Sequence, residues 1–154
     1  MTNVKQCAER LLEKYHVNTP PVNAEYIAEK EGVDVVFVEF SGAASGAIHG
    51  FYDHDEGKIF VNSEDDSEEK LFTIAHELGH FLLHKEYAAS EGYIPRLKTE
   101  VNNEQEREAD EFAVRLLVPS RFGELYADVF DDSEMSKMFL VSKQVVRQAR
   151  DTFV

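Results

Sequence analysis

Apolar positions recur at helical spacing over residues 3–31. Directly after them, apolar residues form short runs of the kind found in strands. The helical spacing predicts helices over residues 3–15 and 23–31. Valine and phenylalanine then crowd residues 33–40, and two further apolar runs, 47–52 and 58–62, flank a polar turn. These three runs predict a small, mostly antiparallel sheet.

The second half of the chain returns to helical spacing. Residues 67–84 carry apolar side chains on nearly all sides, which is typical of a helix that is buried all round. Residues 85–103 show no clear period, and we expect them to be irregular. Helices are predicted again over residues 104–118, 120–130 and 133–152. We expect the last of them to be broken near Val141 and Ser142.

These elements predict an α+β fold. The small sheet would pack on the buried helix, and the C-terminal part would be helical. The chain has 154 residues, a length that suits one domain. We therefore expect a single domain over residues 1–154, with a core over about 20–120 and a helical tail over about 120–154.

Composition narrows the class of protein. Apolar residues make up 43% of the chain and aromatic residues 11%, which is a globular composition. No apolar run reaches the length of a membrane span, and the N-terminus has no signal-peptide hydrophobic region, so we expect a cytoplasmic protein without a membrane partner. The single cysteine, Cys7, agrees with a reducing compartment.

The formal net charge of -14 bears on partners. Such a chain repels the phosphates of nucleic acids, so we expect no direct binding of DNA or RNA. The same charge suits a basic protein partner, such as a DNA-binding protein, although acidic charge in general serves solubility.

The buried helix carries the candidate chemistry. His76 and His80 stand four residues apart and therefore share one helix face, where their ring nitrogens can converge on one zinc ion. Glu77 follows the first histidine and can act as the general base on a metal-bound water. A lone buried histidine is usually a hydrogen-bonded core residue, but three buried ionisable groups are costly unless something offsets them.

A catalytic zinc ion needs a third protein ligand. A third histidine six residues after His80, as metzincins have, is excluded because that position is Glu86. We interpret His84 as a capping residue or a support for a ligand. On the helix predicted over 104–118, Glu106 and Asp110 share the apolar face. Glu106 is thus the best third ligand, and Asp110 can orient a ligand histidine.

The opposite face of that helix holds the other charged side chains, which we expect to be solvated. They are Glu104, Glu108, Glu111 and Arg115.

Two stretches in this order resemble a known family. The chain reads H-E-L-G-H-F-L-L-H from residue 76 and E-R-E-A-D-E-F-A-V-R-L-L-V-P from residue 106, which resembles the ImmA/IrrE family of zinc metallopeptidases and is similar to the wider gluzincin group. The resemblance covers roughly residues 20–120. It implies one zinc ion per chain, held by His76, His80 and Glu106, with Glu77 as the general base and Asp110 behind the ligands.

The resemblance also implies a function. Members of this family are typically cytoplasmic regulators that cleave or otherwise inactivate a helix-turn-helix repressor, and the end of the chain, around residues 135–142, resembles the helix-turn-helix-like end of some relatives. The primary hypothesis is therefore zinc-dependent hydrolysis of a peptide bond in a DNA-binding repressor. The alternatives are a non-proteolytic antirepressor that sequesters its partner and a toxin–antitoxin-type regulator.

Three parts of this mechanism stay open in the sequence. The developing oxyanion needs a donor, and a substrate could add as a strand to Lys58–Asn62 if that strand is a sheet edge. Imidazole and carboxylate ligands also suit manganese or iron. The candidate oxyanion donors are Tyr93, His49, Tyr52 and Tyr87.

Overall fold

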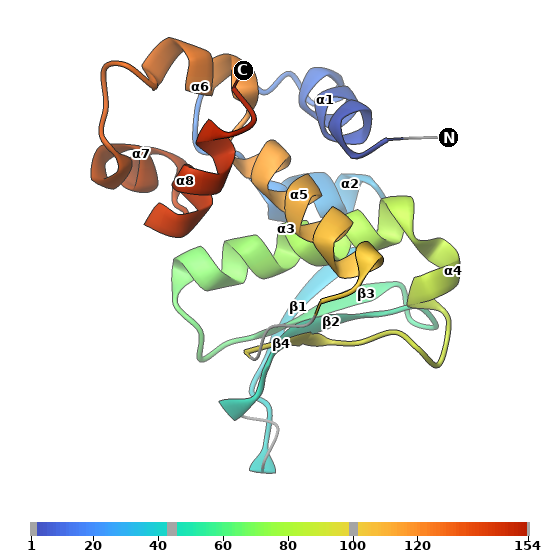
Figure 1. Cartoon of the computed structure of the whole chain (residues 1–154). Helices are drawn as coiled ribbons and strands as arrows, with labels where there is room; N and C mark the ends of the chain where they lie inside the picture. The colour runs from blue at the N-terminus through green and yellow to red at the C-terminus, as the bar shows by residue number, and fades with distance from the viewer. Residues whose placement is uncertain (1–2, 43–45, 99–101, 154) are drawn as a thin grey trace.

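The computed structural model of the chain describes residues 3–42, 46–98 and 102–153. In these residues a small sheet lies against one side of a stack of helices, so the predicted α+β class is confirmed (Figure 1). The helices are α1 (Val4–Lys14), α2 (Ala24–Lys30), α3 (Ser67–Leu83), α4 (Lys85–Ala88), α5 (Glu104–Leu117), α6 (Ser120–Tyr126), α7 (Asp132–Phe139) and α8 (Lys143–Arg150). The strands are β1 (Asp34–Val38), β2 (Ile48–Asp53), β3 (Lys58–Asn62) and β4 (Arg96–Leu97).

The sheet has the strand order β1-β3-β2-β4. Strands β2 and β3 form an antiparallel hairpin in which Phe51 lies opposite Phe60, and β4 pairs antiparallel with β2. The hairpin turn ends at Gly57, whose φ of 65° lies in the left-handed region that glycine adopts without steric cost. Strand β1 pairs parallel with β3, so the sheet is mostly antiparallel, as predicted, with one parallel pair.

One prediction about this region was wrong, and the condition for strand addition at Lys58–Asn62 is not met. Residues 85–103 are not wholly irregular, because they contain the short helix α4 and the strand β4. Lys58–Asn62 is not a sheet edge, because β3 lies between β1 and β2. Among the described strands, the edges of the sheet are β1 and β4.

Helix α3 lies between the sheet and α5, which explains why its sequence is apolar on nearly all sides (Figure 1). Gly79 marks the closest approach of the two helices. A Cβ atom built at this glycine would lie 2.9 Å from Cδ1 of Phe112, a ring on α5 that is fully buried. The missing side chain therefore lets α5 pack directly against the helix that carries the histidines. Other fully buried side chains of this core include Leu11, Ile27, Ile59, Leu78, Leu116 and Leu117.

The helical tail is divided where the sequence predicts a break. Leu140 ends α7 in the left-handed conformation, with a φ of 58°, and the side chain of Ser142 caps α8 by accepting from the backbone N–H of Val145. Arg150 fixes α8 to the preceding segment, donating to the carbonyls of Ala127 and Phe130 at 3.0 Å each. Among the described residues, no helix is both long enough and apolar enough to cross a membrane.

Candidate metal centre

Helix α3 places two histidines and a glutamate inside the protein. Asp66 caps its start by accepting from the N–H of Glu69 at 2.9 Å, and the helix then runs unbroken to Leu83. His76, Glu77 and His80 lie in its buried middle, with 2%, 0% and 0% of their surface exposed. Unpaired charge is very costly at such depth, so these side chains need polar partners.

Helix α5 brings a carboxylate to them. Its start is fixed by Asn103, whose side chain accepts from the N–H of Glu106 at 2.8 Å. Glu106 is 5% exposed and faces the two histidines. The ligand atoms of His76, His80 and Glu106 all lie within 4.8 Å of one another, so these three buried side chains could hold a metal ion.

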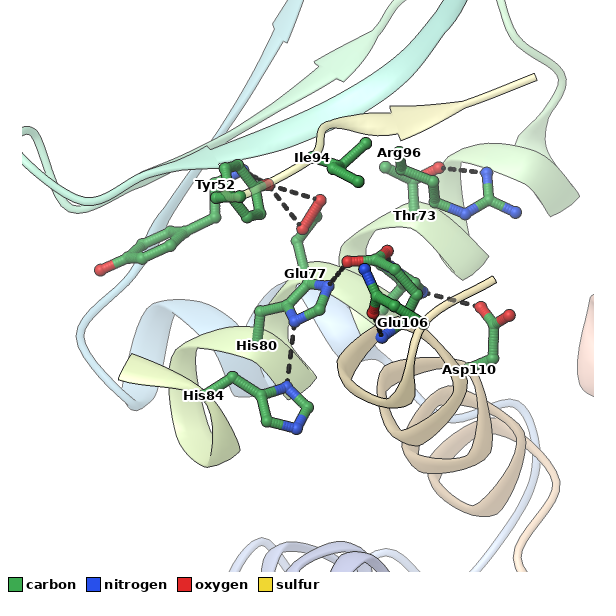
Figure 2. Close-up of polar contacts among 12 residues, drawn as sticks. Tyr52, Thr73, Glu77, His80, His84, Ile94, Arg96, Glu106 and Asp110 are labelled. Atoms are coloured by element: carbon green, nitrogen blue, oxygen red, sulfur yellow. Dashed lines mark hydrogen bonds and ion pairs between the residues drawn. The ribbon is translucent and has the colours of Figure 1, made fainter. Parts of the chain in front are cut away.

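The far nitrogens of both histidines are hydrogen-bonded, which orients the rings. Nδ1 of His76 lies 2.8 Å from Oδ1 of Asp110 (Figure 2). Nδ1 of His80 lies 3.0 Å from Nδ1 of His84, and Nε2 of His84 lies 3.0 Å from Oε1 of Glu108. If each carboxylate accepts, His76 donates from Nδ1, and His84 donates to Glu108 and accepts from Nδ1 of His80. Both ligand histidines then keep Nε2 free for a metal ion.

The atoms that face the centre fit a cation. Nε2 of His80 is buried and has no hydrogen-bond partner among the described residues, although Oε2 of Glu106 lies 3.0 Å away. Nε2 of His76 lies 3.0 Å from Oε1 of the same carboxylate. Two imidazole nitrogens and a carboxylate are the donor set that zinc and related divalent metals prefer.

The charges of the metal-free centre follow from burial and pairing. Burial alone would lower the pKa of His76, but hydrogen bonds to Asp110 and Glu106 outweigh it and raise that pKa to about 9. Burial likewise opposes ionisation of Glu106, but its hydrogen bond to His76 and the nearby ring of His80 hold the pKa of this carboxyl well below its usual range. Burial lowers the pKa of His80. A proton on His76 thus occupies the place that a metal ion would take.

Metal affinity should therefore rise with pH. Because the proton on His76, with its pKa of about 9, must leave before the metal binds, we expect the affinity for zinc to rise about tenfold per pH unit between about pH 7 and about pH 9. His80 and Glu106 add nothing in this range, since their pKa values are lowered. Competition titrations of the metal-free protein against a chromophoric chelator measure this slope. A flat profile would contradict the pairing described for His76.

Glu77 is held beside the metal ligands and does not belong to them. Its two carboxylate oxygens accept from the hydroxyl of Tyr93 at 2.8 and 3.0 Å (Figure 2). The same hydroxyl accepts from the backbone N–H of Tyr52 at 2.7 Å, so strand β2 fixes the ring of Tyr93. Burial raises the pKa of Glu77 to about 7. A carboxylate with such a pKa is suited to general-base work near neutral pH.

The four predicted oxyanion donors lie in different surroundings. Tyr93 is bound to Glu77, and Tyr87 donates to Oε2 of Glu106 at 2.8 Å. The side chain of Tyr52 points away from Glu77 (Figure 2). His49 lines the same cavity as His76, and its Nδ1 lies 2.7 Å from Oδ2 of Asp65.

The metal-ligand group opens into a cavity of about 360 Å³ between β4 and α8. The sequence analysis did not single out Arg96, Gln144 or Gln148, which line it. Arg96 on β4 pairs with Glu69 and donates to Thr73 at 3.1 Å. Gln144 and Gln148 come from α8, more than thirty residues beyond Glu106, and no local pattern connects them to the site. The lining residues are His49, Glu69, His76, Pro95, Arg96, Leu97, Lys98, Glu106, Asp110, Gln144 and Gln148.

Several sequence predictions about α5 can be compared with these contacts. Glu106, on the predicted apolar face, is buried, whereas the side chain of Asp110 is 56% exposed and reaches His76 from the rim of the cavity. Glu108, expected to be solvated, is partly covered because it bonds to His84. Glu111 lies 3.7 Å from Arg115, which is the predicted pair, but the side chain of Arg115 is only 20% exposed and is therefore not solvated as predicted.

Comparisons with known proteins show which proteins this chain resembles. Over 128 residues the chain is 32% identical to an uncharacterized immunity region protein of Bacillus phage phi105, an alignment that covers 77% of this chain and 70% of the phage protein. Its fold is similar to that of a Mycobacterium tuberculosis transcriptional regulator, with a TM-score of 0.64 and 17% identity. That match covers 93% of this chain but only 44% of the regulator, so the chain spans less than half of that protein.

A family model also matches most of the chain. The model of the IrrE N-terminal-like domain, a peptidase family, matches residues 28–149, which include both helices of the metal-ligand group and the tail helices. The chain therefore belongs to the family of the IrrE N-terminal-like domain.

Proposed function

We propose that this chain is a zinc-dependent metallopeptidase that hydrolyses a peptide bond in a protein partner. The observation that supports this most strongly is the position of Glu77, a buried carboxylate beside three buried ligand side chains, two of which, His76 and Glu106, line a cavity. A purely structural metal site is closed by four protein ligands and has no use for such a base.

Zinc, held by His76, His80 and Glu106, would supply Lewis-acid chemistry by polarising the scissile carbonyl and making water acidic enough to attack it. Glu77 takes one proton from the attacking water as the carbon–oxygen bond forms. It then delivers that proton to the amine nitrogen as the carbon–nitrogen bond breaks. The hydroxyl of Tyr93 holds Glu77 in place through both steps.

We assign stabilisation of the oxyanion to His49. Of the four predicted donors, Tyr93 and Tyr87 already donate to carboxylates, whereas His49 lines the cavity from β2. Asp65 accepts at Nδ1, so Nε2 of His49 is the nitrogen left to face a substrate, with Glu69 3.4 Å away. The hydrogen bond to Asp65 fixes the orientation of the ring, as a preorganised oxyanion donor requires.

The free edge of β4 takes the place that the sequence analysis gave to Lys58–Asn62. Strand β4 pairs with β2 on one side only, and its residues Arg96 and Leu97 line the cavity beside the metal ligands. An extended substrate can add to this edge through backbone hydrogen bonds.

For the partner we propose a helix-turn-helix DNA-binding repressor. Proteins that bind DNA carry basic surfaces, and a net charge of -14 steers such a partner toward this chain. The names of two relatives, an immunity region protein and a transcriptional regulator, point to the same kind of process.

Incubating the zinc-loaded chain with helix-turn-helix repressors from the same genome tests this function. We expect two repressor fragments that appear with repeated turnover and disappear when a chelator is added. The His49→Asn variant should keep its metal and cleave about 100-fold more slowly. An intact repressor in a stable complex would instead support sequestration without cleavage, and no interaction would exclude this partner.

A further inference from the structure

Helix α8 forms the wall of the cavity opposite strand β4. Gln144 and Gln148 line the cavity that also contains Arg96, Leu97 and the metal ligand His76. Both glutamines are exposed, and neither side-chain amide has a hydrogen-bond partner in the parts of the chain that the structure describes. Two exposed amides without partners thus line the cavity that the ligands His76 and Glu106 also line.

This wall is held firmly in place. Val145, Val146 and Ala149 on the other face of α8 are buried in the core. Arg150 donates to two backbone carbonyls and to Oδ1 of Asp132 at 2.7 Å. The glutamines therefore project from a fixed helix, and rigid elements position binding groups better than loops do.

The spacing of the two amides matches an extended peptide. Gln144 and Gln148 are four residues apart, which is about 6 Å along a helix. Peptide groups on one edge of an extended chain repeat every two residues, or about 6.6 Å. Each glutamine amide offers a donor and an acceptor, as each peptide group does. Two successive peptide groups on one edge can therefore each meet one glutamine.

The cavity continues beyond Asp110. A neighbouring cavity of about 340 Å³ shares Asp110 and Gln148 with it and runs between α5 and α8. The path past the metal ligands is thus longer than one residue and stays beside α8. The further lining residues are Arg107, Glu111, Val114 and Thr152.

We propose that Gln144 and Gln148 bind the backbone of the substrate, so that an extended segment is held along both edges, by β4 on one side and by α8 on the other. This inference rests on the proposed peptidase function and names its substrate class. A helix cannot be held in this way, because its backbone groups are bonded within the helix. The substrate is therefore an unfolded linker or loop, recognised mainly by its backbone and tolerant of many side chains.

Cleavage of a library of short unstructured peptides with random sequences tests this. We expect the zinc-loaded wild type to cleave many members. The Gln144→Ala/Gln148→Ala variant should show a KM raised about tenfold or more, with kcat changed less than about twofold, since the lost contacts serve binding alone. Alanine favours helix at exposed positions, so circular dichroism and zinc content should be unchanged. Lys143→Ala, on the same helix but outside the cavity lining, is the matched control and should behave as wild type.

Recognition of the substrate backbone predicts a second result, which methylated peptides can measure. Methylating the two backbone N–H groups of a cleaved peptide that face α8 should weaken its cleavage by wild type and have much less effect on the double variant. An unchanged KM in the double variant, or an equal effect of methylation on both proteins, would overturn the proposal and leave the peptidase function standing. Failure of wild type to cleave any library member would also overturn it, because backbone recognition demands little of side chains. Cleavage of the intact repressor would still decide the peptidase function.

Discussion

Replacing Glu77 with glutamine is expected to abolish peptide hydrolysis while the metal stays bound. Glutamine keeps the size of the side chain and loses the basic carboxylate, so the proton of the attacking water has no acceptor. General-base catalysis contributes about 10²- to 10⁴-fold, and kcat should fall by at least about 100-fold with KM little changed. Fragment formation from the repressor and metal content per chain are the two measurements.

The surroundings of Glu77 make this substitution a clean one. The amide oxygen of glutamine can still accept from the hydroxyl of Tyr93, so the contact with strand β2 survives. Because burial raises the folded-state pKa of Glu77 to about 7, the ionised carboxylate costs the metal-free protein stability above that pH. The cost disappears below the unfolded pKa, where the group is protonated in both states. Glu77→Gln should thus leave the metal-free protein at least as stable as wild type at pH values above about 7.

Tyr93→Phe is the control that separates the positioning of Glu77 from its action as a base. It removes the hydrogen bond to Glu77 and keeps the carboxylate, so we expect a partial loss of kcat, smaller than that of Glu77→Gln. If Glu77→Gln cleaves the repressor as fast as wild type, Glu77 is not the base. If neither wild type nor Glu77→Gln cleaves the repressor but both bind it equally well, sequestration is the activity.

The sequence predicts those parts of the fold that local pattern controls. The buried helix α3, the hairpin of β2 and β3 and the break before Ser142 all follow from spacing and capping within a few residues. The parallel pairing of β1 with β3 and the two-residue strand β4 do not, because both depend on partners far along the chain. The strand that forms the edge beside the metal centre was therefore missed.

The residues of the candidate site also fall into two groups, those that local sequence pattern predicts and those that depend on packing between distant segments. Helical spacing alone brings His76 and His80 to one face, and the apolar pattern of α5 singles out Glu106. The bond between His84 and Glu108 needs the packing of α3 on α5, which Gly79 permits by its lack of a side chain. The glutamines of α8 reach the cavity only through the folding of the tail onto α5, which no short-range pattern encodes.

Replacing Glu106 with glutamine is expected to remove the metal. Glutamine is nearly the same size but uncharged, and its amide is a poor ligand for zinc. Loss of an outer-shell partner costs about 10- to 100-fold in metal affinity, so loss of a ligand should cost more than about 100-fold. The fold should survive, because His76 can release its proton and leave no unpaired buried charge. Elemental analysis after dialysis against a weak chelator, beside circular dichroism, measures both quantities.

Two substitutions on the same helix make the test specific to position. Glu104 lies exposed in the first turn of α5, and Glu104→Gln should keep one metal ion per chain. Glu108 bonds to His84, which in turn bonds to His80, so Glu108→Gln should weaken binding by no more than about tenfold. Metal retained by Glu106→Gln, or lost equally by all three variants, would show that the carboxylate of α5 that faces the histidines does not complete the site. A graded loss in the order Glu106, Glu108, Glu104 would follow from direct ligation by Glu106 and indirect support by Glu108 through His84, since the three substitutions remove the same charge from the same helix.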